Sequence, residues 1–412
     1  MKRYVIVGVG QRGLEMFGRR LSSEEFSEQA KLVGVYDINS VRAHEFSKEC
    51  GDIPVFDDFD KMLDETKPDA VIVTTLDCYH HEYIIKAMEA GYDAISEKPM
   101  TIDTEKCRAI FEAEKSTGKK VKVTFNMRFM PYMQRVKELI KEGTVGDILH
   151  VDLQWKLDTC HGADYFRRWH RYLEKSGGLL VHKSTHHFDV VNWWLEQQPE
   201  EVFAFGTRRF YGATRENRGE RCLTCRHKST CEFYWDIKSG DKGSFYTRHY
   251  LEAEKEDGYF RDGCVFAKDI NINDSMSVNV RYSRGTLLTY SLIAYSPYEA
   301  WNAVISGTNG MLEVGEIYSG MGKERPYNII KYYNRKGEAI TYEVPKTDGT
   351  HGGGDYKLIR MLFVGDIEDP LGCQASSIDG AMSLLIGASA NISIARNKPV
   401  FISEQLGGNI KL

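Results

Sequence analysis

The feature that most constrains the fold of this chain is a glycine-rich turn near its N-terminus. Residues 4–8 are apolar and β-branched, which predicts a strand, and they lead directly into Gly8-Val9-Gly10-Gln11-Arg12-Gly13. An amphipathic helix is predicted to follow, through about Leu21. Glycines at these three positions allow a tight turn and let a pyrophosphate approach the N-terminus of the helix. Because the pattern lies between a strand and a helix, it predicts a dinucleotide-binding turn.

An acidic residue ends the second predicted strand, Lys31 to Tyr36, at Asp37. A carboxylate at this place accepts hydrogen bonds from the ribose hydroxyls of NAD and repels the 2′-phosphate of NADP. The first arginine after it, Arg42, lies five positions further on. The sequence therefore favours NAD over NADP.

Strands and helices alternate regularly over the first part of the chain. Helices are predicted over residues 58–66, 80–90 and 104–116, and strands over 69–74, 94–96 and 119–125. Such alternation is typical of a doubly wound parallel sheet. We predict an α/β Rossmann domain over residues 1–125.

The pattern changes at about Leu149, where hydrophobic residues begin to recur with period two. Strands are predicted over residues 151–155, 202–210, 275–282, 286–295 and 303–307, and a helix over 378–395. This indicates an α+β domain over 126–412 with a mainly antiparallel open sheet and a Cys-rich insertion at about 212–268. An open sheet face of this size commonly packs against another subunit, so we expect a homo-oligomer.

Composition limits the partners and the compartment. The 412 residues carry a formal net charge of −5, which argues against nucleic acid and acidic membranes as partners. We find no signal-peptide pattern and no apolar run of about 18 residues, which predicts a cytoplasmic protein. The nine cysteines are then expected to be thiols or metal ligands rather than disulfides.

The run Glu97-Lys98-Pro99 closes a predicted strand. Proline ends the strand and restrains the residue before it, so a cation lies at the carboxyl end of a parallel strand, where open α/β sheets bind ligands. Lys98 could stabilise charge on the oxygen of an alcohol during its oxidation. A nearby nicotinamide would lower the pKa of Lys98, since like charges disfavour the protonated form.

These motifs, in this order and at these separations, resemble the glucose–fructose oxidoreductase / inositol dehydrogenase / MocA (Gfo/Idh/MocA) family. The resemblance extends through Arg128-Phe129-x-Pro131 and covers the first 200 residues best. It implies NAD(P)-dependent hydride transfer on a sugar, cyclitol or related polyol, with Lys98 beside the nicotinamide. The cofactor contacts it implies are Gly8, Gly10, Gln11, Arg12, Gly13, Asp37, Thr74, Thr75, His80, Glu97 and Lys98.

A glycine-led helix from Ser176 onward carries the other expected catalytic groups. The family has an aspartate, a histidine four residues later, and another aspartate three after that; here these positions are His182, His186 and Asp189. We predict His186 as general acid/base, with Lys98 and His182 as the other catalytic residues. A zinc site formed by His182, His186 and Asp189 is the alternative. The predicted substrate contacts are Lys98, Arg128, Trp169, His182, Lys183, His186 and His187.

Two further segments allow more than one role. The insertion contains Cys222, Cys225 and Cys231 in a C-x2-C-x5-C pattern, with Cys264 further on. Four thiolates could hold a structural zinc, with an iron–sulfur cluster, free thiols or a disulfide as alternatives. The run His351-Gly352-Gly353-Gly354-Asp355 either supplies a helix N-cap or approaches the active site from the sheet domain.

Three classes of function are compatible with these residues. The first is an NAD-dependent dehydrogenase or reductase acting on a secondary hydroxyl or ketone of a sugar, cyclitol or glycoside. The second is an NAD-dependent glycoside hydrolase that acts by transient oxidation and elimination, for which the added basic groups at His182, Lys183 and His187 leave room. The third is a non-catalytic NAD-linked sugar-binding or sensor protein, which the presence of Lys98 and His186 disfavours.

Overall fold

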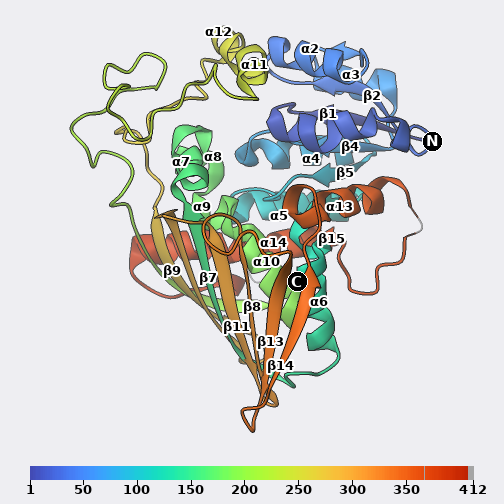
Figure 1. Ribbon diagram of the computed structural model, residues 1–412. Coiled ribbons are helices and arrows are strands. Elements are labelled where there is room, and N and C mark those ends of the chain that lie inside the picture. Colours follow the sequence, from blue (N-terminus) through green and yellow to red (C-terminus); the bar gives the residue numbers. More distant parts are fainter. Residues whose placement is uncertain (366, 407–412) are drawn as a thin grey trace.

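The computed structural model describes residues 1–365 and 367–406, and it contains two sheets that lie one above the other in Figure 1. The upper sheet has seven strands in the order β15-β6-β5-β4-β1-β2-β3, and the pairs among β1 to β6 are parallel. This confirms the predicted doubly wound domain. Its strands are β1 (Lys2–Val7), β2 (Ala30–Tyr36), β3 (Val55–Phe56), β4 (Ala70–Val73), β5 (Asp93–Ser96), β6 (Val121–Val123) and β15 (Ala375–Ser376).

Short polar side chains start several helices of this domain. Asn39, Asp58 and Asp103 are the N-caps of α2, α3 and α5, and each side chain accepts a hydrogen bond from the backbone N–H three residues later. The helical segment that follows the glycine turn begins without such a side-chain cap. The helices are η1 (Gly13–Gly18), α1 (Arg19–Leu21), η2 (Glu24–Phe26), α2 (Ser40–Glu49), α3 (Phe59–Thr66), η3 (Asp77–Tyr79), α4 (His80–Glu89) and α5 (Thr104–Thr117).

The lower sheet has nine strands in the order β14-β13-β12-β11-β7-β10-β9-β8-β16. Every pair is antiparallel except β7 with β10, which confirms a mainly antiparallel sheet. The sequence analysis did not anticipate β12, β13 and β14. The strands are β7 (Ile148–Asp158), β8 (Pro199–Thr207), β9 (Ser275–Tyr282), β10 (Leu287–Ser296), β11 (Ala300–Gly307), β12 (Gly310–Ile317), β13 (Tyr327–Asn334), β14 (Ala339–Pro345) and β16 (Val400–Phe401).

Helices α10 and α14 pack together between the two sheets, and α14 also contacts β8. Contrary to the sequence analysis, α14 is long and apolar enough to span a membrane by length and composition; 67% of its most apolar stretch is buried inside the protein, which accounts for that composition. The remaining helices are η4 (Asn126–Phe129), α6 (Pro131–Lys141), α7 (Thr159–Arg167), η5 (Trp169–Arg171), α8 (Leu173–Ser176), α9 (Leu179–His182), α10 (Ser184–Leu195), α11 (Gly243–Tyr246), η6 (Thr247–Leu251), α12 (Glu254–Asp257), η7 (Thr350–Gly353), α13 (Gly354–Phe363), α14 (Ser377–Arg396) and α15 (Ile402–Gln405).

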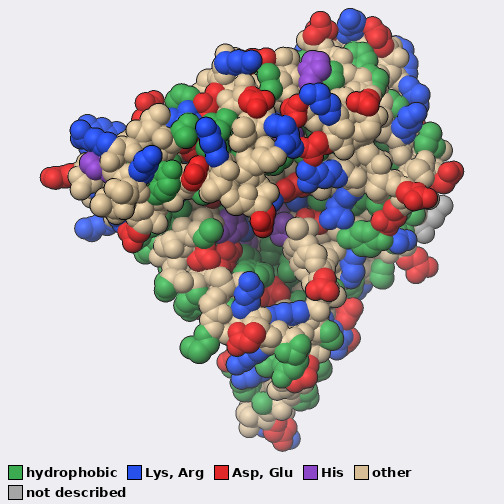
Figure 2. All heavy atoms as spheres, turned by 45° about the horizontal axis from the view of Figure 1, so that its top comes forward, with side chains coloured by type: hydrophobic (Ala, Val, Ile, Leu, Met, Phe, Trp, Pro, Cys, Tyr) green, Lys and Arg blue, Asp and Glu red, His purple; other side chains and the backbone are tan. Residues whose placement is uncertain are grey.

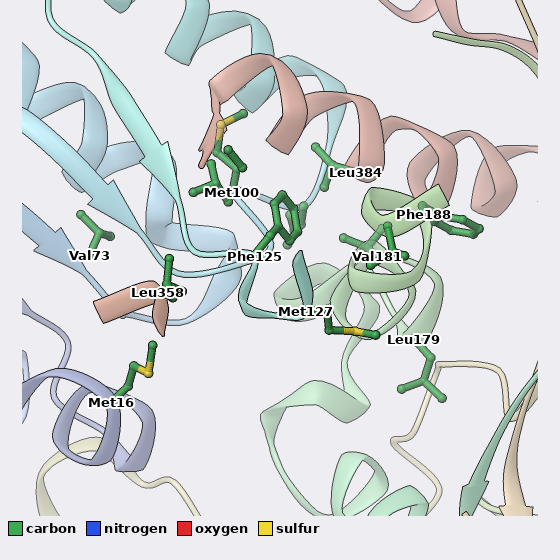
Figure 3. Close-up of a cluster of buried hydrophobic side chains, with 14 of the residues drawn as sticks. Met16, Val73, Met100, Phe125, Met127, Leu179, Val181, Phe188, Leu358 and Leu384 are labelled. Carbon is green, nitrogen blue, oxygen red and sulfur yellow. The ribbon is translucent and has the colours of Figure 1, made fainter. Parts of the chain in front are cut away.

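The hydrophobic core continues from one domain into the other. Figure 3 shows Val73 of β4 and Met16 of η1 in one cluster with Leu358 of α13 and Leu384 of α14. The C-terminal part of the chain also completes the upper sheet, because β15 pairs antiparallel with β6. Segments from both ends of the chain therefore build the region between the sheets.

The insertion leaves the lower sheet after β8 and reaches the upper domain, where α11 and α12 lie beside α2 (Figure 1). Its two ends meet at an antiparallel bridge between Arg221 and Gly263. The Arg221 guanidinium donates hydrogen bonds to Asp262 and Glu254, which fixes this junction. The insertion therefore forms a closed loop, whose two ends lie side by side before the chain continues into β9.

Candidate active site

A cavity of about 1230 Å³ lies between the two domains and extends from the glycine turn to the start of α10. Figure 2 shows a hollow between the upper and lower parts of the molecule, with histidine side chains deep inside it. The glycine turn, β2, the loop after β4, α7 and the α9–α10 segment all contribute to its lining. The cavity brings together most of the predicted site residues: Gly8, Gly10, Gln11, Arg12, Asp37, Thr74, Thr75, His80, Glu97, Lys98, Trp169, His182, Lys183 and His186.

The glycine turn has the close approaches that its sequence requires. Gly8 has φ +78°, and a Cβ there would lie 2.5 Å from the Cα of Thr75. Gly13 packs behind the turn and does not line the cavity. A Cβ on Gly13 would lie only 2.7 Å from the Thr74 hydroxyl. A Cβ on Gly10 would instead project into the cavity, toward Tyr250. The turn therefore leaves room for a pyrophosphate against its backbone.

Asp37 lies at the end of β2, beside this turn. Its carboxylate accepts hydrogen bonds from the backbone N–H of Val9 at 2.7 Å and of Asn39 at 2.9 Å. Arg42 donates to the same carboxylate at 3.2 Å and to Asp257 of the insertion at 2.8 Å. Arg42, beside the predicted ribose position, is therefore engaged by two carboxylates.

The insertion forms an outer wall of the cofactor half of the cavity. The Tyr250 hydroxyl accepts a hydrogen bond from Gln11 N at 2.9 Å, and the Ala253 carbonyl accepts one from Asn39. The Glu256 carboxylate accepts hydrogen bonds from the backbone and hydroxyl of Ser40. Sequence reasoning missed these contacts, since no local pattern reveals which surface a polar insertion covers.

Lys98 is partly buried where the two halves of the cavity meet. Its ammonium donates a hydrogen bond to the His182 carbonyl at 3.0 Å, and burial lowers its pKa to about 8 against the opposing effect of Asp77. The preceding Glu97 accepts a hydrogen bond from Arg12 at 2.9 Å, and Arg12 also pairs with Asp355 of α13 at 3.2 Å. The Asp355 side chain does not cap α13. Of the two roles predicted for the run 351–355, the structure therefore supports the one in which this run approaches the active site from the sheet domain.

His80 holds the two loops around Lys98 together. Its Nδ1 lies 2.8 Å from the Pro99 carbonyl and its Nε2 lies 3.1 Å from the Thr75 carbonyl. Burial lowers the pKa of His80 against the opposing effect of these two carbonyls. His80 thus positions the strand end that carries Lys98.

The helix predicted to carry the histidines is interrupted at Lys183, so His182 ends α9 and His186 lies in α10. Burial, together with the charges of Lys98 and Lys183, lowers the pKa of His186 well below its usual value. The Nδ1 atom of His186 is buried and has no hydrogen-bond partner in the described part of the chain. His186 lines the cavity, and a neutral imidazole in such a place is suited to accept a proton.

His182 makes a different contact. Its Nδ1 lies 2.5 Å from the Asp77 carboxylate, and burial lowers the pKa of His182 while raising that of Asp77. Trp169 lines the cavity nearby and stacks on His170 at 3.7 Å between ring centroids. The family has an aspartate at the position of His182. In this chain the loop after β4 supplies a carboxylate at that place instead, that of Asp77.

Besides Gly13, the predicted residues Arg128, Asp189 and His187 do not line the cavity. Arg128 is buried and donates to Asp189 at 2.8 and 2.6 Å and to Asp379 at 2.9 Å, so it joins η4, α10 and α14. This pairing also removes Asp189 from the alternative zinc site. His187 stacks on Trp155 at 3.7 Å and contacts the Tyr290 hydroxyl, which turns it away from the cavity.

The predicted zinc site is not supported by the structure. Cys222, Cys225, Cys231 and Cys264 all line one small cavity of about 20 Å³, but across residues 1–365 and 367–406 no group of three or more His, Cys, Asp or Glu side chains is arranged to hold a metal ion. Arg167 contacts the Cys222 sulfur at 3.0 Å, and burial raises the pKa of that thiol. Ion pairs and aromatic packing contribute to holding the insertion together.

This combination defines the class of protein. A doubly wound domain with a glycine turn and an acid at the end of β2, joined to an open antiparallel sheet across a deep cavity, is a two-domain NAD-binding oxidoreductase. The chain belongs to the Gfo/Idh/MocA family: residues 2–125 match the oxidoreductase family NAD-binding Rossmann fold, and residues 137–401 match the oxidoreductase family C-terminal alpha/beta domain.

Individual relatives agree with this assignment. The chain is 39% identical to YteT of Bacillus subtilis (strain 168), a protein that is named as an oxidoreductase, over 98% of both chains. It is 30% identical to 2,7-anhydro-N-acetylneuraminate hydratase of Escherichia coli (strain K12), over 50% of this chain and 53% of the relative. The structure of scyllo-inositol dehydrogenase from Lactobacillus casei, with bound NAD(H) and scyllo-inositol, aligns with TM-score 0.64 and 17% identity over 98% of this chain and 99% of that one.

Proposed function

We propose that the chain transfers a hydride between NAD and a secondary hydroxyl or ketone of a sugar, cyclitol or glycoside. The proposal rests on Lys98 and neutral His186, which line the same cavity as the glycine turn and Asp37. The bound nicotinamide supplies the hydride acceptor. The protein must supply a proton acceptor and a positive charge near the reacting oxygen, and these two residues provide them.

Each residue has a defined task in the oxidation of an alcohol. The neutral imidazole of His186 accepts the hydroxyl proton, and the Lys98 ammonium stabilises the oxygen as the C–H bond gives up its electron pair. The His182 carbonyl holds Lys98 at 3.0 Å, and Asp77 holds the His182 ring at 2.5 Å. Reduction of a ketone uses the same groups in reverse, with the proton returned by His186.

The pKa of Lys98 gives an expected pH dependence. Because burial lowers this pKa to about 8, the ammonium is present below pH 8 and is lost as the pH rises through that value. Initial-rate kcat/KM for alcohol oxidation should therefore fall as the pH rises above about 8. In Lys98→Arg the falling limb should move beyond the range tested, since arginine stays charged. An unchanged falling limb in that variant would contradict the role of Lys98.

We propose NAD rather than NADP as the cofactor, because Asp37 and Asp257 together neutralise Arg42. Asp37→Ala should weaken NAD binding about tenfold, as expected for the loss of hydrogen bonds to a charged acceptor, and should strengthen NADP binding. Calorimetric titration of both nucleotides measures the two changes. The exposed variant Asp60→Ala is the control. A parallel loss of affinity for both nucleotides would mean that Asp37 only supports the turn.

A second candidate is supported by the buried Asp77–His182 pair. It provides a second proton-transfer group beside Lys98, which a cycle of oxidation, elimination, addition of water and re-reduction would need. Such a cycle is the glycoside hydrolase alternative, and one sequence relative is named as a hydratase. The insertion that crosses the cofactor edge would suit retention of NAD through the cycle.

One experiment separates the candidates. The protein is incubated with excess NAD and a panel of sugars, cyclitols and nitrophenyl glycosides, while absorbance at the NADH band and nitrophenol release are followed together. Stoichiometric NADH with the sugar or cyclitol supports the dehydrogenase, and nitrophenol release without NADH supports the hydrolase. NAD binding with neither product would support the non-catalytic sensor.

We also propose that the protein acts in the cytoplasm as a homo-oligomer. The lower sheet carries exposed hydrophobic side chains on four of its strands, which a second copy would cover. These side chains are Leu149, Phe205, Leu287 and Ile340. Sedimentation equilibrium at a mass near 47.1 kDa would contradict this proposal.

A further inference from the structure

A second polar cluster lies on the part of the cavity wall that α7 forms. His161 and Tyr165 are four residues apart on this helix, so their side chains share one face, and both line the cavity. Glu299 directly precedes β11, is buried, and does not line the cavity. The oxidation proposed above uses none of these three residues.

The three side chains form a chain of hydrogen bonds. Both carboxylate oxygens of Glu299 lie close to Nδ1 of His161, at 2.9 and 3.0 Å, and Nε2 of the same ring lies 2.9 Å from the Tyr165 hydroxyl. A carboxylate only accepts hydrogen bonds, so Nδ1 carries a hydrogen atom, and in the neutral imidazole Nε2 is then an acceptor. The Tyr165 hydroxyl is therefore the donor to His161.

Backbone contacts fix the position of this chain of hydrogen bonds. Asp158, the N-cap of α7, accepts one hydrogen bond from the His161 backbone N–H at 2.8 Å and another from the Ser319 hydroxyl at 2.7 Å. The Ser319 oxygen in turn accepts a hydrogen bond from the Glu299 backbone N–H at 2.7 Å. The start of α7 is thus tied to the start of β11, which sets His161 against Glu299.

The Tyr165 phenol has capacity for one more partner. Burial raises its pKa, so the phenol keeps its proton at neutral pH. Across residues 1–365 and 367–406, no group donates a hydrogen bond to its oxygen. A group in the cavity can therefore give a proton to this oxygen while the phenol passes its own proton to Nε2 of His161, and no phenolate has to form.

The phenol lies close to the part of the cavity that holds Lys98. The Tyr165 ring makes an edge contact with the ring of His182, with 5.6 Å between the centroids, and the His182 carbonyl accepts the hydrogen bond of the Lys98 ammonium. At the other end of the chain of hydrogen bonds, the His161 side chain is 39% exposed. The chain therefore connects the surroundings of Lys98 with a ring that solvent can reach.

Resting on the second of the proposed functions, we propose that Tyr165 is an acid/base residue that exchanges a proton with the carbon next to the oxidised carbon of the substrate. Lys98 and His186 already serve the hydroxyl that is oxidised, so a further proton acceptor is needed at a neighbouring position, as in an elimination. Once that hydroxyl has become a ketone, the C–H bond beside it is acidic.

The proton transfer balances without a further oxidant. The C–H bond breaks, its electron pair forms the C=C bond of an enolate, and Lys98 stabilises the enolate oxygen. The proton goes to the phenol oxygen as the phenol proton goes to Nε2 of His161, where Glu299 stabilises the imidazolium. A group on the next carbon can then leave with its bonding electron pair, and the reverse proton transfer completes an addition.

Deuterium exchange tests this step apart from hydride transfer. The protein with NAD is mixed in D2O with an inosose or with methyl 3-ketoglucoside, and proton NMR follows the C–H signals beside the carbonyl. Both probes are already ketones, so the exchange needs no oxidation. We expect the wild-type protein to accelerate the exchange, and Tyr165→Phe to lower the enzymatic rate about 100-fold or more, as for the loss of a general base.

His161→Ala tests the relay itself. This variant should also slow the exchange, and imidazole added to the buffer should restore part of the rate, because the lost side chain was 39% exposed. Imidazole should not restore the rate of Tyr165→Phe. A slow His161→Ala variant without rescue would mean that His161 only supports α7. If Tyr165→Phe does not fold, the rescue of His161→Ala decides.

Tyr290→Phe is the matched control. Its hydroxyl is also buried and also lies at hydrogen-bond distance from a histidine, 2.8 Å from Nδ1 of His187, but neither residue lines the cavity. This variant should exchange the probes as fast as the wild-type protein. Equal losses in Tyr290→Phe and Tyr165→Phe would contradict a specific role of Tyr165.

The outcomes separate this inference from the proposed function. Exchange that is no faster with the wild-type protein than with Tyr165→Phe, for both ketones, would overturn the role of Tyr165. NADH formation from a sugar or cyclitol alongside that result would leave the proposed hydride transfer standing. Exchange that depends on Tyr165, without NADH formation or glycoside cleavage, would retain the acid/base residue and overturn the proposed oxidation.

Discussion

Replacing Lys98 with alanine is expected to lower kcat about 10²–10³-fold, the usual effect of removing one group that stabilises charge on a reacting oxygen. Lys98 lines the cavity, and its ammonium is held at 3.0 Å from the His182 carbonyl. Single-turnover reduction of NAD by the substrate identified in the panel measures the loss. NAD affinity should change little, because the glycine turn and Asp37 supply most of the expected contacts.

Two comparisons make the Lys98 result specific. Lys106→Ala removes a lysine that pairs with Asp103 near the start of α5, and it should leave kcat unchanged. Lys98→Arg keeps the charge with a different shape and should retain part of the activity. Full activity in Lys98→Ala would contradict both the dehydrogenase and the hydrolase mechanisms, since each begins with oxidation of a hydroxyl.

Replacing Arg128 with alanine is expected to destabilise the fold by about 3–5 kcal/mol, the cost of leaving buried carboxylates without their partner. Arg128 donates to both oxygens of Asp189 and to Asp379, and thereby joins η4 to α10 and α14. Urea unfolding gives the change in free energy. KM for substrate should stay unchanged in the folded fraction, because the side chain does not line the cavity.

The control for Arg128 lies a few residues away. Arg135 pairs with Glu138 and Glu142 on the exposed side of α6. Its replacement by alanine should cost only about 0–1 kcal/mol, as is usual for exposed ion pairs. A selective rise in KM for Arg128→Ala, with stability unchanged, would instead return Arg128 to the substrate site.

Most of the first domain could be predicted because its signals are local, although α2, β3 and β15 were not anticipated. A strand, a glycine turn and a helix follow one another within about 20 residues, and the caps at Asn39, Asp58 and Asp103 act over one helical turn. The strands β12 to β14 were missed because β13 and β14 carry partly exposed polar and aromatic residues on both faces. Their period-two signal is correspondingly weak.

The types of residue in the candidate site were predicted from the sequence, but their spatial arrangement was predicted only in part. Lys98, His182 and His186 do meet in one cavity. The partner of His182, however, is Asp77, which lies 105 residues away, and the partner of Arg12 is Asp355, which lies 343 residues away. The interruption at Lys183 likewise depends on tertiary packing. Such pairings are fixed by the folded topology, and no spacing along the chain encodes them.

The short strand β15 has a consequence for how the chain can evolve and be divided. It contributes only Ala375 and Ser376, yet it closes the edge of the upper sheet at β6, and α13 brings Asp355 to Arg12 in the glycine turn. A fragment that ended at residue 125 would expose an unpaired strand edge, a template for aggregation, and would lose one carboxylate partner of Arg12. The nucleotide-binding half is therefore not a transferable module: recombination that exchanges it must carry its C-terminal complement along.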